Sequence, residues 1–392
     1  MPEPVIVSAV RTPIGSFLGS LSTVEATELG AVVVRETVKR AGVEPSEVDE
    51  AIMGNVISAG LGQAPARQAT IKAGLPHKVH SLTVNKVCGS GLKAVMLAVD
   101  AILLGHAEIV VAGGTENMSG APYLLEKGRT GYRMGDANIA DAMIKDGLWD
   151  VYNNFHMGVA ADQTAREYDV SREDQDEFAR ESYRRALEAQ EKGWFDDEIV
   201  PVEVPQRKGA PVTVAEDEEP HRVKFDKIGS LRPAFSKDGT VTAANASSIS
   251  DGAAAVLVMS SDRARSEGIT PTARIVGYAS ASREPEWFTI APPESMKKVL
   301  EQSGLAVKDI DLFEVNEAFA VVAILAQRLM KLDPQKVNIH GGAVALGHPI
   351  GASGARILVT LLSAMRKCSA HRALATLCIG GGEAVAMVVE RA

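Results

Sequence analysis

Three features are scarce in this sequence of 392 residues: cysteines, long apolar runs and blocks of positive charge. Three cysteines exclude a disulfide framework, and their odd number fits a reducing compartment. No run reaches the roughly 18 consecutive apolar residues of a membrane helix. The N-terminal sequence MPEPVIVSAVRTP lacks the basic and apolar regions of a secretion signal. We therefore expect a cytoplasmic protein with no membrane partner.

The charge balance argues against nucleic acid as the main partner. The sequence has 41 Lys and Arg residues against 50 Asp and Glu residues, so its net charge is −9. A negatively charged small substrate stays possible, because a local basic pocket can exist on an acidic protein. The apolar content of 46% is that of a globular protein, and the length predicts two or three core units.

Apolar strand-like runs alternate with helical patterns along most of the chain. This alternation indicates right-handed βαβ crossovers and a largely parallel sheet, so the predicted fold class is α/β. The predicted strands lie at residues 5–10, 50–56, 82–87, 108–114, 251–260, 274–279, 311–315, 374–377 and 384–389. The predicted helices lie at residues 23–40, 64–73, 171–192, 293–304, 319–330 and 355–366, with another directly after Cys88.

The alternation breaks down in the middle of the chain, where polar, charged and glycine-bearing segments dominate. We predict an inserted loop domain at residues 119–245. It would separate an N-terminal half, residues 1–118 completed by about 246–268, from a C-terminal half at residues 269–392. Loops on a rigid scaffold commonly carry ligand contacts, so the insertion is expected to bind the substrate.

Three weak internal matches suggest that the two halves are duplicated. Residues 41–56 resemble 303–318, residues 84–91 resemble 337–344, and residues 108–118 resemble 376–386. Chance similarity between strand–turn–helix units is the alternative. If the duplication is real, the turn at Cys88 and the loop around His348 occupy related positions and face one site.

The glycine-rich segment Asn338–Arg356 reads NIHGGAVALGHPIGASGAR and contains His348 between a glycine and a proline. Such a segment packs poorly as a core element but suits the wall of a small site. A predicted helix follows it, and a helix N-terminus favours negative charge.

Two cysteines lie in glycine-containing turns after predicted strands. Cys88 precedes a helix, where the helix dipole is expected to lower the pKa of its thiol. Cys378 is followed by three glycines, whose N–H groups suit an oxyanion. Each cysteine alone is as well explained as a small buried apolar residue, which is the interpretation for Cys368. Zinc binding by Cys88, Cys378 and His348 is the competing hypothesis, but CxxC spacing and a fourth ligand are missing, so no metal site is predicted.

Asn316 follows a predicted strand and enters an apolar helix. An ordinary helix cap is one interpretation, and an amide that orients a water molecule is the other. His156, in NNFHMGVAAD, is undecided by itself.

Taken together, these segments resemble the motif set of the thiolases, the coenzyme A-dependent acyltransferases. The matching motifs are VNKVCGSGLKAV, NEAF, GGAVALGHPIGASGAR, TLCIGGGEAVAMVVER, RTPIGSF, HMGVAAD, LRPAF and GTVTAANAS. The similarity extends over essentially the whole chain. It implies two similar βαβαβαββ halves in a five-layer αβαβα arrangement with an inserted loop domain, assembled as a homotetramer (a dimer of dimers) or a homodimer.

The resemblance also implies a role for each matching residue. Cys88 would be the nucleophile that carries the acyl group, and His348 would take its proton. Cys378 would move the proton at the α-carbon of acetyl-CoA. One oxyanion hole would come from His348 and a water held by Asn316, and the other from the backbone N–H groups of Cys88 and Gly380.

Coenzyme A is expected as substrate and product, with no permanently bound cofactor. The residues that match the family's coenzyme A site are Leu148, His156, Met157, Phe235, Ser247 and Phe319. Arg222 is the candidate for charge near the nucleotide phosphate, with Lys224 or Lys227 as alternatives. Phe288 occupies an acyl-pocket position at which many thiolases have methionine, which resembles the short-chain branch of the family.

That branch condenses two acetyl-CoA to acetoacetyl-CoA plus CoA, reversibly, in fatty acid metabolism. Three alternatives stay open. A degradative 3-ketoacyl-CoA thiolase would accept longer chains. A decarboxylating or HMG-type condensing enzyme would replace Cys378 by histidine or glutamate. A non-catalytic acyl-CoA-binding protein would not need all four matching residues. No potassium site is predicted, because Pro220 stands near the position where potassium-dependent members have tyrosine.

Overall fold

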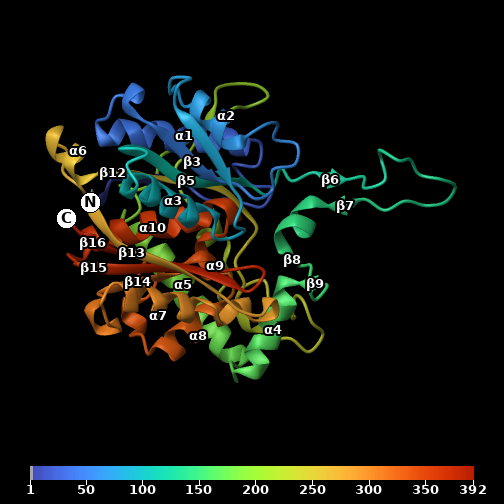
Figure 1. Cartoon of the computed structure of the whole chain (residues 1–392). Helices are drawn as coiled ribbons and strands as arrows, with labels where there is room; N and C mark the ends of the chain where they lie inside the picture. The colour runs from blue at the N-terminus through green and yellow to red at the C-terminus, as the bar shows by residue number, and fades with distance from the viewer. Residues whose placement is uncertain (1–2) are drawn as a thin grey trace.

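The computed structural model describes residues 3–392 and contains a ten-stranded sheet, whose N-terminal and C-terminal parts form separate layers with helices between and outside them (Figure 1). Helices α1 and α2 cover the outer face of the N-terminal sheet, and α7 and α8 cover the C-terminal sheet. Helices α3 and α10 lie between the sheets. The predicted α/β class and five-layer arrangement are therefore confirmed. Within residues 3–392, no helix has the length and apolar character needed to cross a membrane.

The N-terminal half forms a mixed sheet with the strand order β4-β3-β5-β12-β1. Strands β3, β4 and β5 are parallel, and β12 runs antiparallel to β5 and β1. The elements are β1 (Pro4–Arg11), α1 (Ala26–Ala41), β3 (Glu50–Gly54), α2 (Pro65–Lys72), β4 (His80–Val84), α3 (Ser90–Leu103), β5 (Ile109–Asn117) and β12 (Ser250–Ser260), with short β2 (Gly15–Ser16), η1 (Pro45–Glu47) and α6 (Ser261–Ser266).

The C-terminal half repeats this plan with four strands in the order β14-β15-β16-β13, and the counterpart of β4 is reduced to a single bridge between Phe313 and Val337. Two residue pairs between β1 and β13 join the sheets along one edge. The elements are β13 (Ala273–Ser282), η5 (Pro285–Ile290), α7 (Pro292–Gln302), η6 (Val307–Asp309), β14 (Leu312–Val315), α8 (Ala320–Met330), η7 (Pro334–Lys336), α9 (Ala343–Leu346), α10 (Ile350–Lys367), β15 (Arg372–Ile379) and β16 (Glu383–Arg391).

One pair of aspartates shows that the halves are equivalent. Asp49 accepts hydrogen bonds from the N–H groups of two residues at the start of β5, and Asp311 does the same at the start of β15. The first sequence match, 41–56 with 303–318, contains this pair in register, so it is confirmed.

The other two sequence matches are shifted. The aspartate contacts align residues 108–118 with 371–381, five residues from the predicted pairing. The glycines of GGTEN lie within β5, whereas Gly381 and Gly382 form the turn between β15 and β16 at φ of 89° and 88°. Val337 pairs with Phe313, and Ser81 pairs with Ala51, which is the counterpart of Phe313. Val337 therefore corresponds to Ser81 instead of residue 84, so the second match is shifted by three residues.

The segment between β5 and β12 contains many short elements and the 20-residue helix α5. They are β6 (Tyr123–Leu124), β7 (Ala140–Asp141), η2 (Ile144–Leu148), β8 (Trp149–Asp150), β9 (Phe155–His156), α4 (Met157–Glu167), α5 (Arg172–Glu191), β10 (Val202–Val204), β11 (Val212–Val214), η3 (Glu219–Arg222) and η4 (Ile228–Ser230). The hairpin at residues 123–141, here called the arm, projects from the body of the molecule (Figure 1).

A buried ion-pair network holds this segment against the scaffold. The guanidinium of Arg11, at the end of β1, lies 2.6 Å from a carboxylate oxygen of Glu198 and 2.7 Å from one of Asp217. All three side chains are fully buried. Removing one member would leave a buried charge unpaired, so the network fixes where the segment meets β1.

The central helices α3 and α10 pack with their backbones in close contact. A Cβ atom added to Gly91 would lie 2.6 Å from the amide nitrogen of Ala355, and one added to Gly354 would lie 2.3 Å from that of Leu92. Both distances are too short for any side chain, so glycine is required here. Because both glycines lie in the first two turns of their helices, the contact brings the two helix N-termini together.

Candidate active site

A cavity of about 340 Å³, here called the reaction cavity, opens beside the N-termini of α3 and α10. It receives Cys88 from the N-terminal half and His348 and Gly380 from the C-terminal half. Apolar side chains line most of the remaining wall. The lining residues are Cys88, Met118, Gly147, Leu148, His156, Met157, Ala234, Phe235, Ala243, Ala246, Ser247, Ser248, Ile249, Phe288, Ala318, Phe319, His348, Ile350 and Gly380. The expectation that the Cys88 turn and the His348 loop face one site is therefore confirmed.

Cys88 is held by a strained turn between β4 and α3. The preceding Val87 has φ of 46°, a left-handed conformation that β-branched residues rarely adopt. The hydroxyl of Ser90 stabilises the turn, because it accepts from the N–H of Lys86 at 2.8 Å and donates to the carbonyl of Val87 at 2.6 Å. The result is a cysteine side chain that remains partly exposed to the reaction cavity.

The prediction that the helix N-terminus lowers the pKa of Cys88 is wrong. Burial dominates and raises the pKa of the thiol to about 11, although the N–H groups of Gly380 and of Cys88 itself act in the opposite direction. Those two N–H groups are the ones expected to form an oxyanion hole. A thiol with this pKa needs a base at the moment of attack.

Neighbouring groups determine which ring nitrogen of His348 can accept a proton. Its Nδ1 lies 2.5 Å from the hydroxyl oxygen of Ser353, and that hydroxyl donates to the carbonyl of Pro349 at 2.8 Å. Ser353 must therefore accept from Nδ1–H, which leaves Nε2 unprotonated. Burial and the charge of Arg356 lower the pKa of His348 to about 3, so the neutral imidazole is the resting form.

Asn316 and Cys378 complete the arrangement from behind the cavity wall. The amide nitrogen of Asn316 lies 3.5 Å from Nε2 of His348. Its Oδ1 is buried and has no hydrogen-bond partner within residues 3–392, so a water molecule would fit there. Cys378 is fully buried, and burial together with the nearby Cys88 raises its pKa. It packs in the cluster that contains Met157 and Phe288.

Seven of the eight residues predicted to bind substrate lie in the cavity wall. Five of them come from the segment between β5 and β12. They are Leu148, His156, Met157, Phe235, Ser247, Phe288 and Phe319. The ring of His156 stacks on Phe235 with centroids 4.6 Å apart, and its Nδ1 accepts from the N–H of Gly158. Arg222 is exposed on η3 and lies outside the wall, as do Lys224 and Lys227.

Sequence reasoning missed several residues that support these groups. Glu317 is buried and accepts hydrogen bonds from Asn338, Ser182 and the N–H of Val344, which fixes the start of α9. Ser353 lies five residues after His348, within the first turns of α10, and that spacing was the available signal. Met118 and Ile350 line the cavity but carry no polar group that would mark them. The helix α10 also begins at Ile350, five residues before the predicted start, with Pro349 as its cap.

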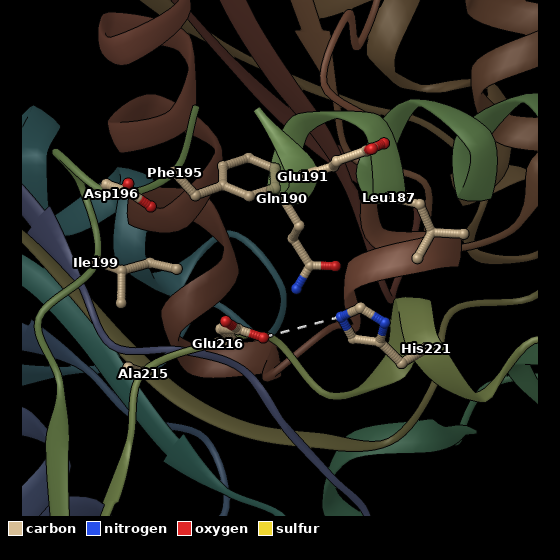
Figure 2. A pocket seen from close by; sticks show the side chains of 9 residues that line it. All are labelled: Leu187, Gln190, Glu191, Phe195, Asp196, Ile199, Ala215, Glu216 and His221. Atoms are coloured by element: carbon tan, nitrogen blue, oxygen red, sulfur yellow. Dashed lines mark ion pairs between the residues drawn. The ribbon is translucent and has the colours of Figure 1, made fainter. Parts of the chain in front are cut away.

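A second cavity, of about 410 Å³, is lined by the end of α5 and by residues of the loops that follow it, and it contains none of the predicted site residues (Figure 2). Its acidic side chains are exposed, and Nε2 of His221 lies 4.0 Å from a carboxylate oxygen of Glu216. Its lining contains no Cys, Ser, Thr or Lys side chain. Within residues 3–392, no group of three or more His, Cys, Asp or Glu side chains is placed to hold a metal ion.

Comparisons with known proteins identify the family of this chain. Residues 4–262 match the family model described as thiolase, N-terminal domain, and residues 269–391 match thiolase, C-terminal domain. An acetyl-CoA acetyltransferase of Cupriavidus necator is 56% identical over 392 residues, with 100% of both chains covered. A protein of the same name from Pseudomonas aeruginosa is 51% identical, also with 100% of both chains covered.

Two solved structures share the whole fold. One is the Acat5 thiolase from Ascaris suum in complex with coenzyme A, with a TM-score of 0.95, 44% identity and 100% of both chains covered. The other is the Bacillus anthracis acetyl-CoA acetyltransferase, with a TM-score of 0.98, 42% identity, and 100% of this chain and 99% of that chain covered. Since both family models match and together span nearly all of the sequence, this chain belongs to the thiolase family.

Proposed function

We propose that this chain is an acetyl-CoA acetyltransferase, which joins two acetyl-CoA to acetoacetyl-CoA and CoA in a reversible reaction. One observation carries the proposal: Cys88 and a neutral His348 meet in an apolar cavity beside the N–H groups of Cys88 and Gly380. The names of the relatives and the coenzyme A bound to the Ascaris enzyme support the same activity.

The first half-reaction transfers an acetyl group to Cys88. Nε2 of His348 accepts the thiol proton as the sulfur attacks the thioester carbon, so thiolate forms only during attack. The N–H groups of Cys88 and Gly380 stabilise the negative oxygen of the tetrahedral intermediate. The carbon–sulfur bond to CoA then breaks, and the leaving CoA thiolate takes the proton of Cys378, so that Cys378 becomes a thiolate and His348 keeps its proton on Nε2.

The second half-reaction forms the carbon–carbon bond. The thiolate of Cys378 removes a proton from the methyl carbon of a second acetyl-CoA, while the protonated Nε2 of His348 and the water at Asn316 donate hydrogen bonds to the enolate oxygen. The carbanion attacks the acetyl-Cys88 carbonyl, the Cys88 thiolate leaves and takes the proton from His348, and both thiols and the neutral imidazole are restored. The high pKa of Cys378 suits this step, because a weakly acidic thiol gives a strong base.

The apolar wall and the stacked pair of His156 and Phe235 are proposed to hold the pantetheine arm of CoA. Arg222, or Lys224 or Lys227, is proposed to contact the nucleotide phosphates outside the enclosed cavity.

We also propose the domain division at residues 118/119 and 245/246, a cytoplasmic location, and no permanent cofactor, membrane partner or nucleic acid partner.

Replacing Cys88 by alanine should lower the rate of acetyl-CoA condensation by more than about 10³-fold, because the covalent route is lost. Binding of CoA, measured by calorimetry, should stay within a few-fold. The matched control is Cys368→Ala, which removes an exposed thiol just after α10 and should leave the rate unchanged. Normal turnover in Cys88→Ala would refute the nucleophile assignment.

Phe288 should restrict the enzyme to short acyl chains. Its side chain is 2% exposed and meets Phe319 edge-on with ring centroids 6.4 Å apart, so it closes the acyl end of the cavity. We expect thiolysis of the four-carbon 3-ketoacyl-CoA to exceed that of the eight-carbon substrate by at least about tenfold, and Phe288→Ala to narrow this ratio. Equal wild-type rates at both lengths would favour a degradative thiolase.

The arm is proposed to assemble a homotetramer from two dimers. Its residues Tyr123, Leu125, Met134 and Ile139 are exposed although apolar, and Met134 is completely exposed. Such side chains on a projecting hairpin gain free energy by packing against another copy. Light scattering should give four chains for the full protein and two after residues 125–139 are replaced by a short glycine-containing turn. A tetramer that survives the replacement would exclude this role of the arm.

A further inference from the structure

Glu116, near the end of β5, is a fully buried carboxylate with four N–H donors around it. One oxygen accepts from Nδ2 of Asn55 at 3.0 Å and from the N–H of Ile57 at 3.2 Å. The other accepts from the N–H of Val56 at 3.1 Å and from the N–H of Gly351 at 2.9 Å. Within residues 3–392 it has no ion-pair partner, so these hydrogen bonds are what stabilises its charge.

The contact with Gly351 reaches from one half of the molecule to the other. Gly351 is the second residue of α10 and lies three residues after His348. A Cβ atom at Gly351 would lie 2.6 Å from the Glu116 carboxylate, so glycine is needed for this approach. The carboxylate therefore lies at the positive end of the helix that follows His348, where a negative charge is stabilising.

The other three donors come from the loop that follows β3. Its residues Val56 and Ile57 pack with Met118 and Ile350 in the apolar cluster against which Cys88 lies. Glu116 therefore joins β5 to the start of α10 and to the apolar cluster that packs beside Cys88. We propose that Glu116 is a positioning residue. It holds the N-terminus of α10, and therefore His348, at the correct distance and orientation from Cys88. This inference rests on the proposed function.

Burying the carboxylate of Glu116 costs free energy, so we expect this residue to have a specific role. Burial raises the pKa of Glu116 to about 7, although the N–H groups of Val56, Ile57 and Gly351 lower it. The charge of Glu116 also raises the pKa of Cys88. A purely electrostatic effect of Glu116 would therefore oppose thiolate formation, whereas a positioning effect would assist it, and the two effects can be separated by experiment.

The test is Glu116→Gln, measured beside the wild type. Glutamine has the same shape, but whichever way its amide turns, the NH₂ group faces two N–H donors. We expect kcat for acetyl-CoA condensation to fall by about 10²-fold, as for a misplaced catalytic group. We expect KM to stay within about twofold and the alkylation of Cys88 by iodoacetamide to slow with kcat, because His348 would accept the thiol proton less well. The combination of unchanged KM with slower alkylation distinguishes positioning from general loss of structure.

The matched control is Asp217→Asn, which also removes a buried carboxylate with both backbone and side-chain donors but does not line the reaction cavity. It should lower Tm, whereas kcat and the alkylation rate should fall far less than in Glu116→Gln. Wild-type kcat in Glu116→Gln, or faster alkylation, would overturn the inference. If Glu116→Gln does not fold, Glu116→Asp keeps the charge but cannot reach all four donors, and a wild-type kcat there would overturn it equally. A wild type without condensation activity would instead refute the proposed function.

Discussion

The close contact between α3 and α10 is the constraint on which the rest of the site depends. Two glycines allow the helix backbones to meet where any side chain would collide. The N-termini of the helices then converge, so Cys88, before one helix, and His348, before the other, open into the same cavity. A site built from both halves follows directly from the duplicated fold, because each half supplies one central helix.

Burial sets the chemistry at this point. The surrounding protein raises the pKa of Cys88 to about 11 and lowers that of His348 to about 3, so both groups are neutral at rest. A neutral pair in an apolar cavity avoids the cost of a buried ion pair before the substrate arrives. Ser353 selects the tautomer of His348 that leaves Nε2 as the acceptor, and two backbone N–H groups are proposed to stabilise the charge that develops on the substrate oxygen.

Much of the fold and of the site could be predicted, because local patterns in the sequence indicate both. Alternating apolar runs gave the α/β class, and the glycine motifs around Cys88, His348 and Cys378 indicated the chemistry. The register of the repeat was not predictable, since glycines within β5 and glycines in the β15–β16 turn look alike in a sequence. The sign of the Cys88 pKa shift was wrong because burial depends on residues far apart in the chain.

Residues that act through tertiary contacts were invisible at the sequence level. Glu116 is a single acid in the polar end of a strand, GGTEN, and its partners come from a loop 60 residues earlier and a helix 235 residues later. Ser353 and Glu317 lie within motifs but have no feature that separates them from structural residues. The position of Arg222 on an exposed turn is likewise a property of the folded insertion.

The central claim is that Cys88 becomes acylated within a cavity shared by the two halves. Its most direct test is the intact mass of the protein after brief incubation with acetyl-CoA, followed by peptide mapping. The account predicts a single added acetyl group, located on Cys88 and removed by added CoA. No adduct under conditions where CoA binds would indicate a non-catalytic binding protein. An adduct on Cys378 would show that the roles of the two cysteines are reversed.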